Sequence, residues 1–382
     1  MRDGYRIIDT DTHVGPTADT LYAHGSAALR ARRGELAPYE FQGRDGTGLS
    51  INPFPYQRPM GGRGGADEAE RGGSPSLKGK TGNNFRGAPQ PGVSVDNSTG
   101  RLLDMDREGR DVDVIIPGTF ATAVSAIEPD LATELHAAYN RYIVEYCAVN
   151  PDRLKATILA PAWQPVWAAA EIRRLAAERC VAAVTVILPE GLPIDDPDLH
   201  PIWSAMDDND LPILHHSFFY EPPYFPGYRD VWGHIAVARA AAHPWGAQRL
   251  LGYALLSGLF DQFPNLRIGF AECSAGWLPA WLVRLEGQAD YLHATLPALK
   301  HTPLEYCEAG RVFCGVDLYE GAAIVRSIIE VIGDGAIMFQ SDYPHDQCYF
   351  PASTDEVLAW ELPEPSKRRL MSENAERFLR MA

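Results

Sequence analysis

The chain has 382 residues, of which 46% are hydrophobic, and its formal net charge is −16 at pH 7. So negative a protein repels polyanions, which argues against non-specific binding to nucleic acid or to anionic membranes. No apolar run approaches the roughly 18 to 20 residues that span a bilayer, and the N-terminus lacks the apolar stretch of a secretory signal. We therefore expect a cytoplasmic protein that acts on a small molecule, with no nucleic-acid or membrane partner.

Eight strand-like apolar runs recur along the chain, with helical segments between them. The strands are predicted at Arg6–Thr12, Val112–Pro117, Leu154–Leu159, Ala182–Leu188, Leu211–His216, Arg267–Glu272, Val312–Val316 and Ile337–Ser341. Most runs are continuous rather than alternating, as expected for parallel strands buried on both faces. Helical patterns fall at Asp130–Val149, Pro165–Cys180, His234–Phe263, Gly321–Ile332 and, as a closing segment, Ser366–Arg380. This order predicts an α/β fold, a (β/α)8 TIM barrel that forms one domain over residues 1–382.

Residues 34–100 interrupt the pattern after the first strand. The stretch is rich in Gly and Pro and shows no helical or strand periodicity. In a barrel it would leave from the catalytic face, and its interleaved aromatic residues suggest that part of it packs down. We expect a lid or a subunit-contact segment, with plain surface disorder as the alternative.

Acidic and imidazole side chains stand at the ends of four of the predicted strands. They are Asp11 and His13 at strand one, His215 and His216 at strand five, Glu272 at strand six, and Asp342 and His345 at strand eight. The carboxyl ends of barrel strands meet at one mouth, so these groups converge if the barrel closes. Converged, they offer nitrogen and oxygen ligands to one divalent cation. The six cysteines are scattered without a CxxC pair, which argues against a disulfide framework or a Cys-rich zinc site.

Each of these residues also has a simpler explanation. An Asp after a strand is usually a helix cap, and Glu272 could be a buried salt-bridge partner. His215 and His216 point to opposite sides of their strand, so one of them packs outward or makes a structural hydrogen bond. What favours a metal site is that several such groups stand at strand ends together.

Five stretches of the sequence resemble one family. They are IIDTDTHVGP, LLDMDREGRDVDVIIPG, LPILHHS, LFDQFPNLRIGFAECSAGWLPAWLVRLE and IMFQSDYPH. In order and spacing they resemble the amidohydrolase superfamily, specifically the amidohydrolase-related group that includes aminocarboxymuconate semialdehyde decarboxylase and the benzoate-type decarboxylases. The resemblance implies a TIM barrel with one catalytic metal, and it makes a homodimer the expected assembly.

The resemblance also implies a ligand set. On this chain the family pattern assigns the metal to Asp11, His13, His216 and Asp342. The family usually carries His-x-His on the first strand, so Asp11 is a departure that makes the site harder and favours Zn²⁺ or Mn²⁺. Glu272 is a second departure, because the decarboxylases of the group carry a His at that position.

The chemistry of this set allows more than one reaction. A divalent cation lowers the pKa of bound water, and Glu272, with a possible share for Asp342, can take or give a proton beside it. We expect a metal-dependent hydrolase, because an acidic residue replaces the decarboxylase histidine. The alternative is non-oxidative decarboxylation of an aromatic or enoic acid, and a second alternative is a catalytically inactive barrel used for binding.

Aromatic side chains near the strand ends suggest a planar substrate, aromatic or carboxylate-bearing. The residues expected to contact the substrate or to support the site are His345, Trp277, His215, Phe219 and Arg229. Either Arg229 or His345 would recognise an anionic group. For the aromatic residues, ordinary packing is an equally good explanation.

Overall fold

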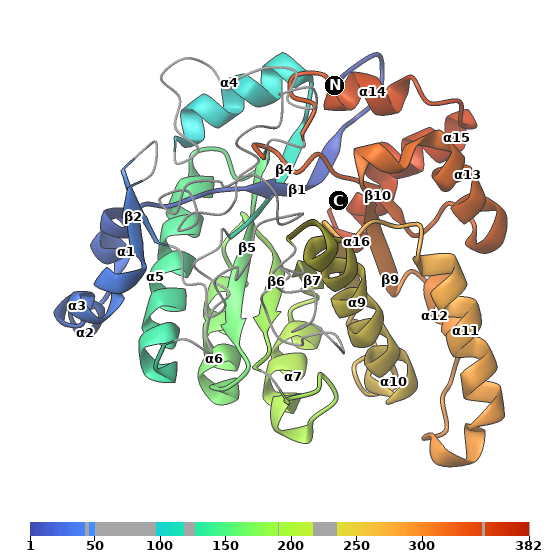
Figure 1. The fold of residues 1–382 in the computed structure, drawn as a ribbon, viewed down its shortest axis with the longest axis horizontal. Helices are drawn as coiled ribbons and strands as arrows, with labels where there is room; N and C mark the ends of the chain where they lie inside the picture. The colour runs from blue at the N-terminus through green and yellow to red at the C-terminus, as the bar shows by residue number, and fades with distance from the viewer. Residues whose placement is uncertain are drawn as a thin grey trace, which may run out of the picture.

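Eight parallel strands and the helices that connect them form a (β/α)8 barrel (Figure 1). The computed structural model describes residues 1–42, 46–49, 97–117, 127–189, 191–216, 235–345 and 348–381. In spatial order the barrel strands are β1 (Ile8–His13), β4 (Val112–Ile116), β5 (Leu154–Pro161), β6 (Val181–Ile187), β7 (Ile213–His216), β8 (Ile268–Ala271), β9 (Val312–Val316) and β10 (Ile337–Phe339). All eight strands predicted from the sequence are present, with ends that differ by a few residues.

Helices surround the barrel. Their bounds are α1 (Ala18–His24), α2 (Ala27–Ala31), α3 (Arg33–Leu36), α4 (Ser98–Glu108), α5 (Pro129–Ala148), α6 (Pro165–Leu175), α7 (His200–Asp208), α9 (Ile235–Leu256), α10 (Leu259–Gln262), α11 (Leu278–Tyr291), α12 (Pro303–Glu308), α13 (Gly321–Ile332), α14 (Ser353–Leu358), α15 (Glu364–Arg368) and α16 (Asn374–Leu379). Helix α13 matches its predicted range, whereas the helix predicted at 234–263 is divided into α9 and α10. Gly258 lies between them with a φ of 78°, a left-handed conformation that interrupts a helix.

The C-terminal helix α16 closes the barrel at the N-terminal ends of the strands. Its apolar side chains share one buried core cluster with residues of the strands. Gly269 of β8 makes room for the aromatic ring of Phe378, because a Cβ at that glycine would lie 2.6 Å from the ring. Arg267 Nε donates to Phe378 O at 2.6 Å and ties the helix to the start of β8. The closing segment predicted at 366–380 therefore covers the end of the barrel opposite the mouth.

At the other end, the first and last strands are joined at the mouth, the face where the carboxyl ends of the strands meet. His13 N donates to Tyr343 O at 2.7 Å, and Asp342 N donates to Asp11 O at 3.0 Å. Thr10 Oγ1 adds a hydrogen bond to a carbonyl of β10. The barrel is thus closed through the same short segments that carry several of the predicted ligands.

The segment predicted as an insertion, 34–100, is described only at its two ends. Its first part contains the turn η1 (Ala37–Tyr39) and a hairpin of β2 (Glu40–Gln42) and β3 (Thr47–Leu49). In Figure 1 the hairpin lies beside α1 at one edge of the barrel. Residues 50–96 lie outside the described residues, so the lid or subunit-contact role stays a prediction.

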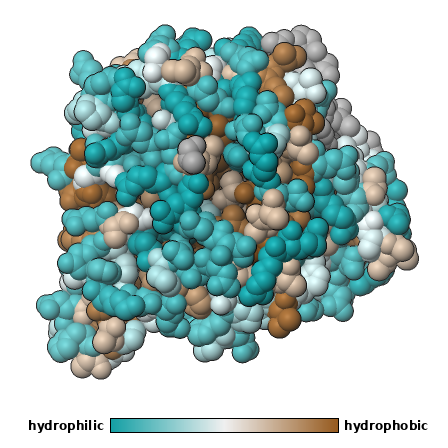
Figure 2. Space-filling view, turned by 180° about the vertical axis from the view of Figure 1, so that it is seen from behind, coloured by the Kyte–Doolittle hydropathy of each residue, from teal (hydrophilic) through white to brown (hydrophobic). Residues whose placement is uncertain are grey.

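The face of the molecule seen in Figure 2 is mostly hydrophilic, with hydrophobic residues scattered among polar ones. Large apolar side chains that are exposed, such as Val166, Tyr291 and Tyr319, stand on separate elements. Isolated apolar groups of this kind are ordinary on a globular surface. Across the described ranges, none of the helices has both the length and the apolar character needed to cross a bilayer.

Candidate metal centre

Side chains from four strand ends lie together at the mouth of the barrel. Asp11 and His13 come from β1, and His216 is the last residue of β7. Glu272 directly follows β8, and Asp342 stands three residues after β10. All five side chains are almost inaccessible to solvent, with exposures from 0% to 5%. The barrel therefore gathers two imidazoles and three carboxylates, remote in sequence, into one buried cluster.

The facing atoms are spaced like atoms that share one cation. His13 Nε2 lies 3.2 Å from Asp11 Oδ1 and 3.1 Å from Asp342 Oδ1. His216 Nε2 lies 3.9 Å from the same Asp11 oxygen. Two ligand atoms at about 2.1 Å from an ion are about 3.0 Å apart at a right angle and about 3.4 Å apart at the tetrahedral angle. Within the described residues, ligand atoms close enough to share an ion form two groups that have His13 in common: Asp11, His13 and His216, and His13, Glu272, Asp342 and His345. The predicted set of Asp11, His13, His216 and Asp342 draws on both groups and stays a prediction.

The side-chain atoms of Asp11 and His13 also suit a metal ion, because they make no conventional hydrogen bonds with the residues that the structure describes. Asp11 and His13 pair with each other, and His13 with Asp342, as ion pairs. Within the described residues, neither carboxylate oxygen of Asp11 and neither ring nitrogen of His13 makes a hydrogen bond of normal geometry. A buried carboxylate without such bonds is costly, and native proteins rarely leave one. A divalent cation between these groups would remove the cost. Imidazole nitrogen and carboxylate oxygen are ligands that Zn²⁺ and Mn²⁺ accept.

The electrostatic field of the cluster favours a cation as well. Burial lowers the pKa of His13, but the carboxylates of Asp11 and Asp342 outweigh burial and raise that pKa to about 10. Burial raises the pKa of Asp342, but the charge of His345 and the hydrogen bonds from His13 and His345 together outweigh burial and lower that pKa to about 2. The carboxylates thus hold a proton on the His13 ring, and a divalent ion would take the place of that positive charge.

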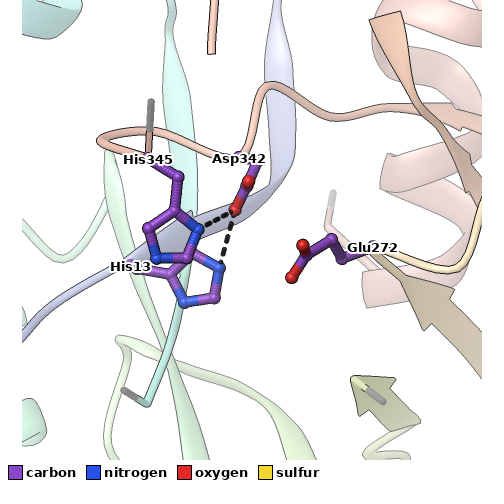
Figure 3. A group of neighbouring side chains, drawn as sticks. All are labelled: His13, Glu272, Asp342 and His345. Carbon is purple, nitrogen blue, oxygen red and sulfur yellow. Dashed lines mark hydrogen bonds and ion pairs between the residues drawn. The ribbon is translucent and has the colours of Figure 1, made fainter. Parts of the chain in front are cut away.

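His345 lies beside Asp342 and over His13 (Figure 3). Its Nδ1 lies 2.5 Å from Asp342 Oδ1, and its ring stacks on the His13 ring with the centroids 4.3 Å apart. The side chain of His345 is 43% exposed, so the pair connects a buried carboxylate with the protein surface. This is the geometry of a residue that orients a ligand carboxylate, and its role at the site stays a prediction.

Glu272 faces the cluster from the opposite side of the mouth (Figure 3). Its Oε2 lies 3.1 Å from His216 Nε2. Its backbone carbonyl is 2.9 Å from Nδ1 of His243, a buried residue of α9. His243 lies in a helix rather than at a strand end, so no strand-end pattern in the sequence points to it. Glu272 is therefore held at the edge of the candidate site, where it can exchange a proton with a molecule bound there.

Two predicted residues that the structure describes, His215 and Trp277, do not join the cluster. His215 packs its ring edge-on against Phe270, with the centroids 5.9 Å apart. Trp277 donates its indole N–H to two backbone carbonyls of the turn that precedes it. Phe219 and Arg229 lie outside the described residues. Substrate contacts for these four residues stay predictions.

Asp9 precedes Asp11 by two residues but belongs to a separate buried cluster. The register of β1 against β4 shifts just after Asp9. Its carboxylate lies 3.0 Å from Arg110 Nη1 and accepts hydrogen bonds from the Ser341 amide at 3.0 Å and hydroxyl at 2.5 Å. Because Ser341 precedes Asp342, this cluster fixes the backbone that carries a candidate ligand. The sequence offered no local signal for the partnership with Arg110.

Among curated proteins, the chain is similar to gamma-resorcylate decarboxylases. It is 27% identical to that of Rhodococcus jostii (strain RHA1) over 286 residues, which cover 67% of this chain and 82% of that protein. It is also 27% identical to that of Rhizobium sp. (strain MTP-10005) over 307 residues, which cover 74% of this chain and 86% of that protein. The expectation of a hydrolase was therefore wrong, and the decarboxylase alternative is favoured. The Glu272 carboxyl, at the end of the sixth strand, can protonate a substrate carbon as well as activate water. A glutamate at this position is therefore compatible with decarboxylation and does not by itself indicate hydrolysis.

Solved structures of decarboxylases share the fold. A 5-carboxyvanillate decarboxylase from Sphingomonas paucimobilis matches with a TM-score of 0.69 at 23% identity, covering 99% of this chain and 100% of that chain. The enzyme of the same name from Novosphingobium aromaticivorans matches with a TM-score of 0.69 at 20% identity, covering 100% of this chain and 97% of that chain. It was solved with manganese and 4-hydroxy-3-methoxy-5-nitrobenzoic acid. At these identities the likeness concerns the fold alone.

The amidohydrolase family model matches residues 101–381. The match takes in seven of the eight barrel strands, from β4 to β10, and the site residues His216, Glu272 and Asp342. The remaining strand, β1, precedes the match and supplies the other two members of the candidate set. Because the model covers well over half of the chain, the protein belongs to the amidohydrolase family.

Proposed function

We propose that this protein is a metal-dependent, non-oxidative decarboxylase of a small aromatic acid. The observation that carries the proposal is the buried cluster of possible metal ligands at the mouth of the barrel, in which Glu272 Oε2 lies 3.1 Å from His216 Nε2. The names of the relatives support the same reaction, since they act on gamma-resorcylate and 5-carboxyvanillate. A hydroxylated benzoate is therefore the substrate class that we propose.

Asp11, His13, His216 and Asp342 would hold the ion, with Mn²⁺ as our first choice and Zn²⁺ as the alternative. Two carboxylates in the set make it suited to a hard cation, and a relative from Novosphingobium aromaticivorans is solved with bound manganese. When bound, such a cation supplies a Lewis acid for the carboxylate and the neighbouring hydroxyl oxygen of a substrate.

Glu272 is the residue that we propose as proton donor. In the reaction a proton adds to the ring carbon that bears the carboxylate, and the bond between that carbon and the carboxylate then breaks. The electron pair of the broken bond restores the aromatic ring as carbon dioxide leaves. Glu272 Oε2 lies at the rim of the candidate site, within reach of a molecule held there. Asp342 is the alternative donor, although it already accepts a hydrogen bond from His345.

The test is carbon dioxide release by the purified, manganese-loaded protein from 2,6-dihydroxybenzoate and from 5-carboxyvanillate. We expect resorcinol and vanillate as the organic products, and in D₂O one deuterium on the carbon that lost the carboxylate. Esters and amides of the same acids, incubated in water enriched in ¹⁸O, test hydrolysis in the same preparation. Incorporation of ¹⁸O without carbon dioxide release from any hydroxybenzoate would overturn the proposal.

Two further expectations keep the status of predictions. The homodimer rests on the family resemblance alone, and light scattering of the purified protein tests it. The cytoplasmic location stays a prediction, and fractionation of cells that express the protein tests it.

A further inference from the structure

Glu272 and Ser274 both have backbone conformations that residues other than glycine rarely adopt. Their φ angles are 48° and 55°. Such left-handed residues are unfavourable in isolation and persist where surrounding contacts hold them, often at functional sites. The segment 272–276 belongs to the connection between β8 and α11 and presents the Glu272 carboxyl to the candidate metal centre. The contacts that hold this segment therefore decide where the carboxyl points.

Asp317, which directly follows β9, binds the segment. Its Oδ2 accepts hydrogen bonds from the Ser274 amide at 3.0 Å and from the Ser274 hydroxyl at 2.9 Å. The same oxygen accepts from the Tyr319 hydroxyl at 2.6 Å. Three residues further along, Glu320 accepts from the next two backbone amides of the segment. Asp317 is buried, so water competes little for these bonds.

Gln340 connects Asp317 to Glu272 itself. Its Nε2 donates to Asp317 Oδ1, and its Oε1 accepts from the Glu272 amide at 3.3 Å. Only one orientation of the Gln340 amide satisfies both neighbours, because a carboxylate needs a donor and a backbone N–H needs an acceptor. Gly315 of β9 leaves the space for this bridge, since a Cβ there would lie 1.8 Å from Gln340 Oε1.

We infer that Asp317 is a positioning residue: through Ser274 and Gln340 it holds Glu272 in the left-handed conformation that aims its carboxyl at the candidate metal centre. The inference deepens the proposed function and rests on it for the catalytic role of Glu272. The carbonyl side of Glu272 is held by His243, whose Nδ1 lies 2.9 Å from the Glu272 carbonyl oxygen. With both its amide and its carbonyl engaged, Glu272 has a fixed backbone from which to act.

Asp317→Asn removes one anchor at nearly unchanged volume. Asparagine has one acceptor oxygen and one NH₂ group in place of two acceptor oxygens. If the oxygen faces Ser274, the NH₂ group faces Gln340, whose amide must then rotate and turn its own NH₂ toward the Glu272 N–H. If the oxygen faces Gln340, the NH₂ group opposes the two Ser274 donors. Either arrangement releases part of the segment.

Gly315→Ala breaks the same bridge from a different position. The added methyl displaces the end of the flexible Gln340 side chain rather than backbone, so the variant is expected to fold. It leaves Asp317 and Glu272 chemically intact. Gly287→Ala is the matched control, because a Cβ at that helical position meets no heavy atom within 4 Å.

The full-length, manganese-loaded protein and the three variants are compared by steady-state kinetics, metal content and hydrogen exchange of peptides that cover 268–277. For D317N and G315A we expect unchanged metal content, a KM within about threefold of wild type and a kcat lowered by about 100-fold, the typical cost of misplacing a reacting group. The amides of 272–276 should exchange faster in both. G287A should match wild type in every measurement.

Three results would overturn the inference. They are a wild-type kcat in both variants despite faster exchange, unchanged exchange in both, and a loss of metal that accounts for the loss of kcat. Failure of the proposed function looks different: the wild-type protein itself would release no carbon dioxide from the benzoates tested. In that event the exchange measurement still decides whether Asp317 holds the segment.

Discussion

Glu272 and Asp342 share the left-handed backbone conformation, with φ angles of 48° and 61°. Each is held by a second buried carboxylate through a serine that lies within two residues of it in the chain. Asp317 holds the segment of Glu272 in this way, and Asp9 holds that of Asp342. Two acids at the mouth of the barrel are thus positioned by two others, each on the adjacent strand, which explains why these unfavourable conformations persist.

Replacing Glu272 by Gln is expected to preserve the metal and to remove most of the turnover. Glutamine keeps the shape of the side chain but cannot deliver a proton, and general acids typically contribute about 10²- to 10⁴-fold to a rate. Metal analysis and kcat are measured on the same preparation. Asp342→Asn serves as the comparison, because it alters a candidate ligand and should lower metal content as well. Normal turnover of E272Q would remove Glu272 from the mechanism.

Binding of Mn²⁺ should stabilise the protein through Asp11. At a free concentration of about 100 times Kd, a ligand that binds only the folded state raises the free energy of unfolding by about 2.7 kcal/mol. We expect denaturant titrations to show this gain for wild type after chelation and reloading, and to show little of it for Asp11→Asn. Asp19→Asn, at an exposed position of α1, is the control and should behave as wild type. A full gain for D11N would exclude Asp11 from the site.

His345 is expected to tune metal affinity through its hydrogen bond to Asp342. Residues that orient a metal ligand typically contribute about 10- to 100-fold to affinity. His345→Phe keeps a ring beside His13 but has no donor, so Mn²⁺ should bind at least about 10-fold more weakly. His345→Asn retains an N–H donor and should fall between the two. Equal affinities in calorimetric titrations of all three proteins would show that this hydrogen bond does not orient the ligand.

His215 should make the protein less stable in mild acid. Burial lowers its pKa to about 3, whereas an exposed histidine titrates near 6.5. As the pH falls below about 6.5, the unfolded chain binds a proton that the folded chain does not, so the free energy of unfolding decreases. Phenylalanine at this position keeps an aromatic contact with Phe270 and abolishes the titration. Denaturant titrations at about pH 7 and about pH 5 should therefore show a smaller loss of unfolding free energy for H215F than for wild type. Equal losses in the two proteins would show that His215 does not cause the acid sensitivity.

The sequence by itself determined the barrel. Eight continuous apolar runs, each too short to be a membrane span and separated by helical patterns, are enough to specify parallel strands buried on both faces. Helix α13 was placed at its observed bounds because its apolar periodicity and the glycine that follows it are local signals. The rule that strand ends share one face then brought Asp11, His13 and Asp342 into one proposed site.

Only the tertiary structure decided which partners the buried acids Asp317 and Asp9 contact. Asp317 directly follows its strand, as Glu272 does, and the same strand-end rule would have selected it. Its carboxylate nevertheless faces Ser274 rather than the candidate metal. Asp9 pairs with Arg110, which is remote in the chain. The physical reason is that a contact between strands depends on register, twist and barrel closure. These properties arise from the packing of the whole sheet, and no local run of residues encodes them.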